Sequence, residues 1–325
     1  MRRYVIWLLC LAFATFLIQN PWTSQYIGGL KQASVSASKN MDLYNEIQDY
    51  AQSVYIPPKD AKIDRVWKKT PGLNGLQVDI DASYQNMKKE GKFIENLLVY
   101  EQVPPSTHLR DLPAEPIYKG HPDKPMISFL INVAWGEEYL LDILATLKKH
   151  NVKATFFLEG RWVQKNPDLA KMIAEGHHDI GNHSYSHPDL KTLSSAATYD
   201  ELKKTNEIIK ATTGIKPVWF APPSGAFRQE TVEIAQKLNM ETIMWSVDSI
   251  DWQKPSKEVW LGRVLPKLHN GAMILMHPTA STRDSIETLI TEAKKRGYQI
   301  GTVSKLLSEE RILSTKEEQR LSDHH

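Results

Sequence analysis

Two histidines four residues apart are the side chains of this sequence best suited to chemistry. His183 and His187 lie in the segment HHDIGNHSYSHPDL, with Ser184 between them and Pro188 directly after. A short apolar segment precedes them, which predicts that the pair lies where a strand gives way to a loop. Two neutral imidazoles suit a cation such as Zn²⁺, which in catalytic sites takes three protein ligands and an open water position. The alternative is a pair of loop histidines hydrogen-bonded to the backbone.

The elements that must position this pair are predicted from alternating apolar runs and amphipathic stretches after Met126. Runs that are apolar throughout and separated by helices indicate parallel strands buried on both faces. The seven predicted strands are ISFLINV, ATFFL, HDIG, PVWFA, TIMWSV, AMILM and YQIGTV. The predicted helices cover Glu138–His150, Pro167–Glu175, Ala197–Thr213, Gln229–Leu238, Lys257–Leu268 and Ser285–Arg296. We therefore predict an α/β fold, a closed or nearly closed β/α barrel.

Clusters of polar residues, glycine and proline end five of these runs. They are INVAWG at 131–136, GNHSYSH at 181–187, APPSG at 221–225, VDSIDW at 247–252 and LMHP at 275–278. In β/α barrels the chemistry collects at the C-terminal ends of the strands, so the five clusters should converge on one rim. This convergence favours the metal interpretation of His183 and His187.

In this order the clusters resemble the motifs of NodB-like polysaccharide deacetylases, the carbohydrate esterase family 4, over residues 126–309. The resemblance is to the sporulation-associated branch of that family in spore-forming Gram-positive bacteria, where the first motif ends in W-G. It implies a distorted barrel of seven β/α units, the NodB-type fold. It also implies a divalent metal, usually zinc, held by one Asp and two His, and deacetylation of N-acetylated sugars in chitin or peptidoglycan. His183 and His187 match the two histidine ligands.

Further family positions are matched outside the histidine pair. The resemblance implies that His277 is a general acid and that Asp251 orients and charges it. The alternatives are a packing role for His277 and a capping role for Asp251. Four residues are expected to contact the sugar: Trp135, Pro223, Trp252 and Leu275. Trp219 and Trp245 lie in or beside the same clusters, although tryptophan on barrel strands also serves as core.

Two motifs lack the residues on which the family's chemistry depends. The family's T-F-D-D segment carries the catalytic base and the metal carboxylate, and here it reads LINV at 130–133. Asn132 therefore stands, impaired, at the base position, and Val133 stands at the metal position. The family's arginine, which orients the base, is replaced by Ala221. The paired loss is consistent, because an arginine without its buried carboxylate would be an uncompensated charge.

These departures favour weak or lost activity. We expect the divalent metal, zinc in the family, to be weakly bound or absent unless Glu137 or Glu138 replaces the lost carboxylate. The implied function is that of a polysaccharide deacetylase-like protein, which acts on or binds peptidoglycan or a chitooligosaccharide-like glycan at the cell or spore envelope. The alternative is a catalytically silent glycan-binding or structural envelope protein.

The start of the chain predicts export. Arg2 and Arg3 precede the apolar run Tyr4–Ile18, which has the length of a secretory h-region. The run is shorter than the roughly 20 residues that span a bilayer. Ala12-Phe13-Ala14 lies inside it as a candidate cleavage site, so a cleaved signal peptide and a retained membrane anchor both remain open. The protein is then expected in the cell wall or spore envelope, secreted or membrane-anchored.

Composition and sequence segments complete the expectations. The formal charge is +2 with no basic stripe, which argues against nucleic-acid binding. The single cysteine, Cys10, excludes an intrachain disulfide.

A small α/β unit is predicted at 71–105, resembling the peptidoglycan-binding module of some cell-wall transpeptidases; a structural packing unit is the alternative. The predicted segments are 1–22 (signal or anchor), 23–70 (polar lead), 71–105, 106–125 (Pro-rich linker), 126–309 (deacetylase-like domain) and 310–325 (polar tail).

Overall fold

The chain forms two compact units. The computed structural model describes residues 2–313, apart from the side chains of 17–19 and 34–38. Within that range, one unit takes 2–56, 76–102 and Leu313, and the other takes 57–75 and 103–312. The chain thus enters the larger unit at Pro57 and leaves it again after Gly75, so the division differs from the predicted boundary between 70 and 71. From residue 314 the predicted tail lies outside the described residues.

The smaller unit is built on two consecutive helices. Its elements are α1 (Arg2–Gln19), α2 (Pro21–Val54), β3 (Gly75–Asp79), α3 (Ile80–Met87), η1 (Glu95–Leu97) and β4 (Val99–Val103), and β3 pairs with β4. Leu43, Ile47 and Ala51 recur every four residues along α2 and pack with residues of the small sheet, such as Leu76 and Val78. This spacing gives α2 one buried face only near its end.

A bend separates α1 from α2. The Asn20 side chain accepts a hydrogen bond from the Trp22 backbone N–H, and Pro21 occupies the first helical position. Both features favour a new helix start at this point. Among the described residues, no single helix has the length and apolar character needed to cross a bilayer. The segments 2–16 and 21–33, bent by 55°, meet those criteria of length and composition together.

The larger unit contains a curled parallel sheet. Its strands are β5 (Met126–Val133), β6 (Thr155–Leu158), β7 (Asp179–Asn182), β8 (Trp219–Phe220), β9 (Glu241–Thr242), β10 (Val247–Asp248), β11 (Met273–Met276) and β12 (Gln299–Gly301). The strand order is β10-β11-β5-β6-β7-β8-β9, and β12 pairs with the first three residues of β5. The predicted α/β, NodB-type barrel fold is confirmed.

The barrel is distorted because one short run of chain supplies both edges of the sheet. β9 pairs with β8 and β10 pairs with β11, at opposite ends of the strand order. Only residues 243–246 lie between them. The run TIMWSV, predicted as one strand, therefore contributes to two short strands and crosses the opening of the barrel. Ile243 bridges to Ile117, which approaches the same opening from the preceding segment.

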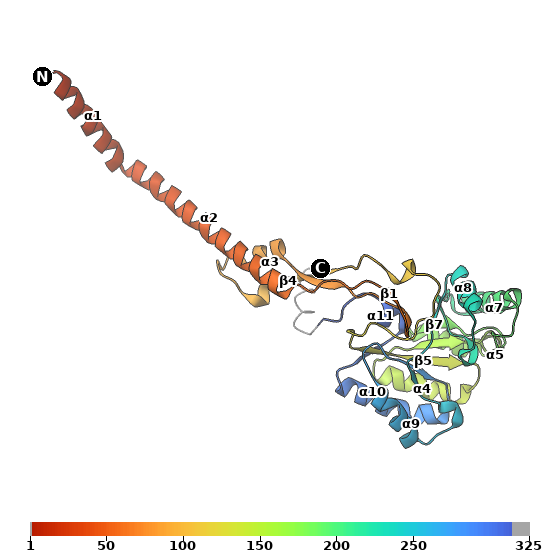
Figure 1. Cartoon of the computed structure of the whole chain (residues 1–325). Coiled ribbons are helices and arrows are strands. Elements are labelled where there is room, and N and C mark those ends of the chain that lie inside the picture. Colours follow the sequence, from red (N-terminus) through yellow and green to blue (C-terminus); the bar gives the residue numbers. More distant parts are fainter. Residues whose placement is uncertain (1, 314–325) are drawn as a thin grey trace. The chain divides into compact units, whose positions relative to one another are not determined.

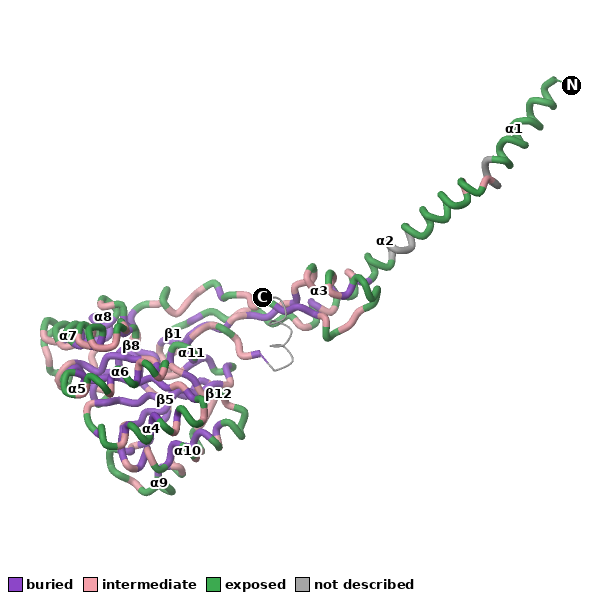
Figure 2. Tube along the Cα trace, turned by 180° about the vertical axis from the view of Figure 1, so that it is seen from behind, coloured by how far each residue is buried: buried purple, intermediate pink, exposed green. Residues whose placement is uncertain are grey.

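Helices cover the outside of this sheet (Figures 1 and 2). They are α4 (Glu137–Lys149), α5 (Gly160–Lys165), α6 (Pro167–Glu175), α7 (Ser195–Thr213), α8 (Gln229–Lys237), α9 (Lys257–Val264) and α10 (Ala280–Lys295). The short helix α11 (Val303–Leu307) instead packs Val303, Leu306 and Leu307 into the core inside the barrel. The remaining elements are the antiparallel pair β1 (Lys62–Asp64) and β2 (Lys68–Thr70), and the 3₁₀ turns η2 (Leu109–Asp111), η3 (Pro223–Gly225), η4 (Asp251–Gln253) and η5 (Leu265–Lys267).

Strand alternation divides β5 between two cores. Ile131 and Val133 belong to the core that β5 shares with α4 and α10. Leu130 belongs to the core inside the barrel, together with Phe157. Successive side chains of a strand point to opposite faces, so Asn132 follows Leu130 toward the barrel interior. It is the last inward-facing position before the strand ends.

Candidate functional site

A cavity of about 420 Å³ opens where the C-terminal ends of β5, β7, β10 and β11 meet. The residues that line it are Asn132, Ala134, Trp135, His183, His187, Ser224, Trp245, Asp248, Trp252, Leu275 and His277. The cavity thus gathers Asn132, both histidines of the pair, His277 and three of the four expected sugar contacts. Each of the five clusters predicted to converge on one rim contributes residues to this cavity.

The loop that carries the histidine pair is tightly held. Ser184 and His187 adopt left-handed backbone angles, with φ of 61° and 55°, which are uncommon for residues other than glycine. The Ser184 backbone N–H donates to the Asn182 side chain at 2.8 Å. Glu201 of α7 accepts from the backbone N–H groups of Tyr185, at 2.9 Å, and of the next residue. These bonds fix the approach of the two rings, whose centroids are 5.0 Å apart.

The chemical form of His183 follows from its surroundings. Its Nδ1 lies 2.7 Å from the carbonyl oxygen of Ala221, so Nδ1–H donates and Nε2 keeps its lone pair. Burial, followed by the neighbouring His187, lowers the pKa of His183 to about 3. The His187 pKa is lowered as well, chiefly because protein atoms partly desolvate the ring. Both rings are therefore suited to act as neutral ligands.

The donor set does not complete the metal site that the resemblance implies. Among the described residues, no group of three or more His, Cys, Asp or Glu side chains is arranged to hold an ion. Val133, at the expected metal-carboxylate position, is fully buried in the core that faces the helices. Neither Glu137 nor Glu138 lines the histidine cavity. Two imidazoles and the Asn132 amide therefore fit a resident catalytic zinc poorly.

Asn132 itself is positioned to meet a ligand. It is 4% exposed, and its Oδ1 has no hydrogen-bond partner among the residues that the structure describes. A buried carbonyl oxygen without a partner is costly unless something else supplies a donor. Because Asn132 also lines the cavity, its side-chain amide is placed beside a bound molecule.

At the end of β11, the strand next to β5, the cavity carries an imidazole held by a carboxylate. Asp251 is fully buried, and its Oδ1 lies 2.7 Å from Nδ1 of His277. The Thr282 hydroxyl donates to Asp251 Oδ2 at 2.6 Å. Trp135 stacks on the His277 ring, with planes 9° apart and centroids 5.7 Å apart. The His277 ring is thus fixed on one side by a carboxylate and on one face by an indole, which leaves Nε2 for the cavity.

A second cavity of about 380 Å³ adjoins the first. The two share Trp135 and Trp252, whose indoles are 44% and 56% exposed. Glu138, Tyr139, Lys254 and other residues around the starts of α9 and α10 complete its lining. Exposed indoles that separate two hollows suit an extended, flat ligand such as a chain of sugar rings.

Some expected sites lie elsewhere, and some residues of the cavity were not predicted. Pro223 is buried and does not line the cavity; its neighbour Ser224 does. Trp219 is also outside the lining, and its indole N–H donates to Ser304 at 2.8 Å. Asp248 belongs to the cluster VDSIDW but was not predicted as a site residue. It lines the cavity, since its neighbour Val247 on β10 points to the helices and Asp248 therefore points to the barrel interior.

Comparisons with known proteins agree with this geometry. A family model described as polysaccharide deacetylase matches residues 119–243. The chain is 54% identical over 307 residues to YlxY of Bacillus subtilis, covering 94% of this chain and 96% of that protein. It is 32% identical over 202 residues to the peptidoglycan-N-acetylmuramic acid deacetylase PdaA of the same organism, covering 60% of this chain and 76% of PdaA.

Solved structures extend the comparison. The crystal structure of a wild-type CE4 family pseudoenzyme from Bacillus anthracis is 55% identical, has a TM-score of 0.77, and covers 83% of this chain and 96% of its own. A mutant of that protein, described as having restored enzymatic activity, is 54% identical, also with a TM-score of 0.77, and covers 83% and 99%. The fold, the cavity and these relatives together identify the chain as a member of the carbohydrate esterase family 4 of polysaccharide deacetylases.

Proposed function

We propose that this protein binds an N-acetylated glycan of the cell or spore envelope, peptidoglycan or a relative of it, and hydrolyses it weakly or not at all. The observation that carries the proposal is Asn132, the side chain that β5 directs into the cavity. An amide oxygen accepts a hydrogen bond but does not take up a proton near neutral pH, as a catalytic base must. The side-chain amide of Asn132, which lines the cavity, suits hydrogen bonding with a sugar hydroxyl or an acetamido group.

Other residues that the family resemblance assigns to the site are still present in the cavity, and they support glycan binding. His277 would stand beside the amine of an amino sugar, where its fixed ring can donate or accept one hydrogen bond through Nε2. The exposed indoles of Trp135 and Trp252 line both cavities and offer flat faces on which sugar rings can stack. A zinc ion, if bound, would rest on His183 and His187 and would supply a Lewis acid; with two imidazoles we propose that this binding is weak.

The choice of glycan rests on the relatives. PdaA is described as acting on N-acetylmuramic acid of peptidoglycan, and a Listeria monocytogenes relative, PgdA, as acting on its N-acetylglucosamine. Both descriptions favour a peptidoglycan ligand for this cavity. We further propose that Arg2, Arg3 and the exposed apolar side chains of α1 direct the chain to the membrane, with the barrel on the wall side.

The test measures binding and hydrolysis in the same preparation. Chitooligosaccharides and peptidoglycan fragments are titrated by calorimetry, and acetate release is followed in parallel. We expect saturable binding without acetate release. Trp252→Ala should weaken binding about 2- to 10-fold, since an aromatic contact contributes on the order of 0.5–1.5 kcal/mol. Trp67→Ala, which removes an indole outside this cavity, is the matched control.

A second candidate function is residual deacetylation with a replacement base. Asp248 favours it, because this carboxylate lines the same cavity as Asn132 at the lost base position. Its Oδ1 already accepts the Ile250 backbone N–H at 2.8 Å, which leaves the other oxygen for a water. Acetate release by the unmodified protein that is abolished by Asp248→Asn and by His277→Ala would establish this function and refute the silent one.

A further inference from the structure

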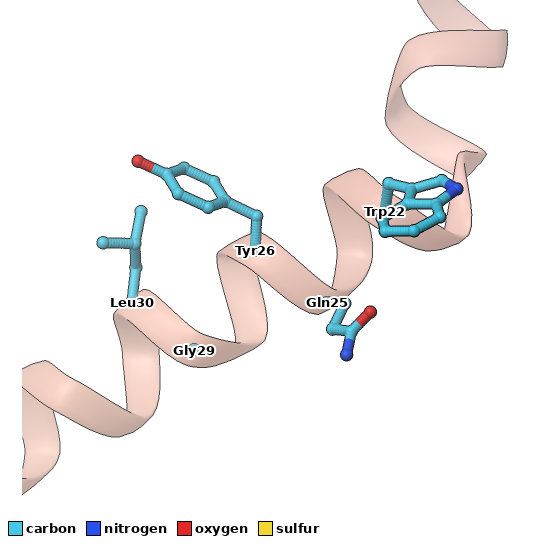
Figure 3. A pocket seen from close by; sticks show the side chains of 5 residues that line it. All are labelled: Trp22, Gln25, Tyr26, Gly29 and Leu30. Atoms are coloured by element: carbon cyan, nitrogen blue, oxygen red, sulfur yellow. The ribbon is translucent and has the colours of Figure 1, made fainter.

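The first turns of α2 carry an exposed apolar face. Trp22, Tyr26 and Leu30 recur every four residues and are 80%, 68% and 53% exposed. Side chains at this spacing lie along one face of a helix. Tyr26 and Leu30 project to the same side, while Gln25 projects to the other (Figure 3). No part of the described chain covers this face.

The helix before this face is equally uncovered. Apolar side chains of α1 such as Trp7 and Leu8 are 76% and 67% exposed. No charged residue occurs between Arg3 and Lys31, so the uncharged segment continues well past the end of α1. At about 1.5 Å per residue, the 18 residues of α1 extend roughly 27 Å, slightly less than the roughly 30 Å of a hydrocarbon core.

The residue types and the bend identify the environment that would cover the exposed face. Tryptophan and tyrosine concentrate at membrane–water interfaces, where the ring meets acyl chains and the polar atom meets head groups. The 55° bend turns the beginning of α2 away from the α1 axis, as a helix must turn to leave a spanning direction and lie toward the membrane plane. Lys31 is the first charged residue after Arg3.

We propose that residues 21–31 lie in the head-group region of the membrane, with Trp22, Tyr26 and Leu30 against the acyl chains and Gln25 toward water. The inference rests on the membrane anchoring proposed above and places its outer boundary at Lys31, beyond the anchor predicted at 1–22. The occupant of this face is lipid, because the face follows the apolar helix α1 in the chain with no charged residue between them.

The experiment uses the full chain with Cys10→Ser, since Cys10 is the lone cysteine of the sequence and is exposed. Single cysteines are introduced by Tyr26→Cys, Leu30→Cys, Gln25→Cys and Leu8→Cys, and each is labelled with an environment-sensitive NBD dye. The proteins are reconstituted into phosphatidylethanolamine–phosphatidylglycerol vesicles with and without nitroxide-labelled lipids. We expect blue-shifted emission and quenching by the lipid nitroxide at 8, 26 and 30, and water-like emission at 25.

Each other pattern overturns the inference in a recognisable way. Quenching at 8 alone leaves the anchor intact and removes the interfacial placement. No quenching at 8 removes the anchoring and with it the inference. Quenching at 25 equal to that at 26 and 30 shows that the bent pair crosses the bilayer together. Emission at 26 and 30 that is blue-shifted but insensitive to lipid nitroxide identifies a second copy of the chain as the occupant.

Discussion

Asp251 holds His277 through both of its carboxylate oxygens. Oδ1 lies 2.7 Å from the ring Nδ1, and Oδ2 accepts the His277 backbone N–H at 2.6 Å. One buried carboxylate thus fixes the ring, its tautomer and the backbone from which it projects. The Thr282 hydroxyl completes the arrangement at Oδ2. This half of the site is fully formed, although the neighbouring strand β5 carries Asn132 in place of an acid.

Asp251→Asn should be destabilising although it is nearly isosteric. The amide oxygen can keep the bonds made at Oδ2, but the amide nitrogen would then face Nδ1 of His277 and impose the other ring tautomer, and the hydrogen bonds to a buried charge would be lost. We expect the free energy of unfolding to fall by about 1–3 kcal/mol in urea denaturation. The control is Asp248→Asn, where the accepted Ile250 N–H bond can be kept by the amide oxygen. An Asp251→Asn protein as stable as wild type would contradict the proposed arrangement.

Asn132→Asp should restore part of the deacetylase activity. It returns a base to the position that β5 presents to the cavity, and a general base contributes typically about 10²- to 10⁴-fold to rate. We expect acetate release from chitooligosaccharide to rise above the wild-type level, and to be lost again with His277→Ala. An Asn132→Asp protein that binds glycan as wild type yet releases no acetate would show that the base alone is insufficient.

Val133→Asp, by contrast, should damage the fold. Val133 is fully buried among Ile131 and other apolar residues beneath the helices, so a carboxylate there would have no partner. Such burial costs several kcal/mol, and we expect a loss of at least about 3 kcal/mol in thermal or urea unfolding. Val133→Leu, which keeps the apolar contact, is the control. Wild-type stability of the aspartate variant would show that the side chain turns into the cavity.

The two neighbouring positions show how far the sequence could predict the site. The apolar runs and the clusters that end them were sufficient to predict the strands, the barrel and the rim at which His183, His277 and Asn132 meet. The resemblance treated Asn132 and Val133 as a pair in the same site. Strand periodicity allows only one of them to face the barrel interior, and the structure extends β5 through Val133. The alternation of side chains along β5 could therefore have shown from the sequence that Val133 points away from the site.

Other features could not be read from the sequence because they depend on contacts between distant segments. The Glu201 carboxylate that holds the histidine loop comes from the middle of α7, where an acidic residue predicts only a solvated face. The run TIMWSV is apolar enough for one strand, and nothing local indicates that it serves two edges. Pro223 shares its cluster with Ser224, and only the tight turn η3 decides which of them faces the cavity.

Zinc should bind weakly and through the histidine pair. Loss of a second-sphere partner already lowers metal affinity about 10- to 100-fold, so loss of a ligand should lower it at least as far. We expect extended chelation to strip the purified protein completely, and His183→Ala to remove the remaining zinc binding in calorimetry. His178→Ala, which changes a buried histidine outside the cavity, should leave it unchanged. Stoichiometric zinc that survives chelation would reveal a third ligand.

Stability should fall as the pH is lowered from about 6.5 toward 4, because three buried histidines are held neutral. Burial lowers the pKa of His178 from 6.5 to about 4, and likewise that of His121 to about 4. A histidine with a depressed folded pKa stabilises the fold fully above its unfolded pKa, since only the unfolded chain takes up the proton between the two values. His183 contributes in the same direction, with a pKa of about 3.

His178→Asn tests this pH dependence at a single residue. The Nδ1 atom of His178 accepts the Ala154 backbone N–H at 3.1 Å, and an asparagine oxygen can take its place without titrating. We expect the stability lost between pH 7 and pH 4.5 to shrink, by an amount on the order of 2 kcal/mol. The control is His177→Asn, an exposed neighbour whose φ of 55° asparagine readily adopts. If urea midpoints of wild type and His178→Asn fall in parallel as the pH is lowered, His178 takes up its proton in the folded state and does not govern the acid sensitivity.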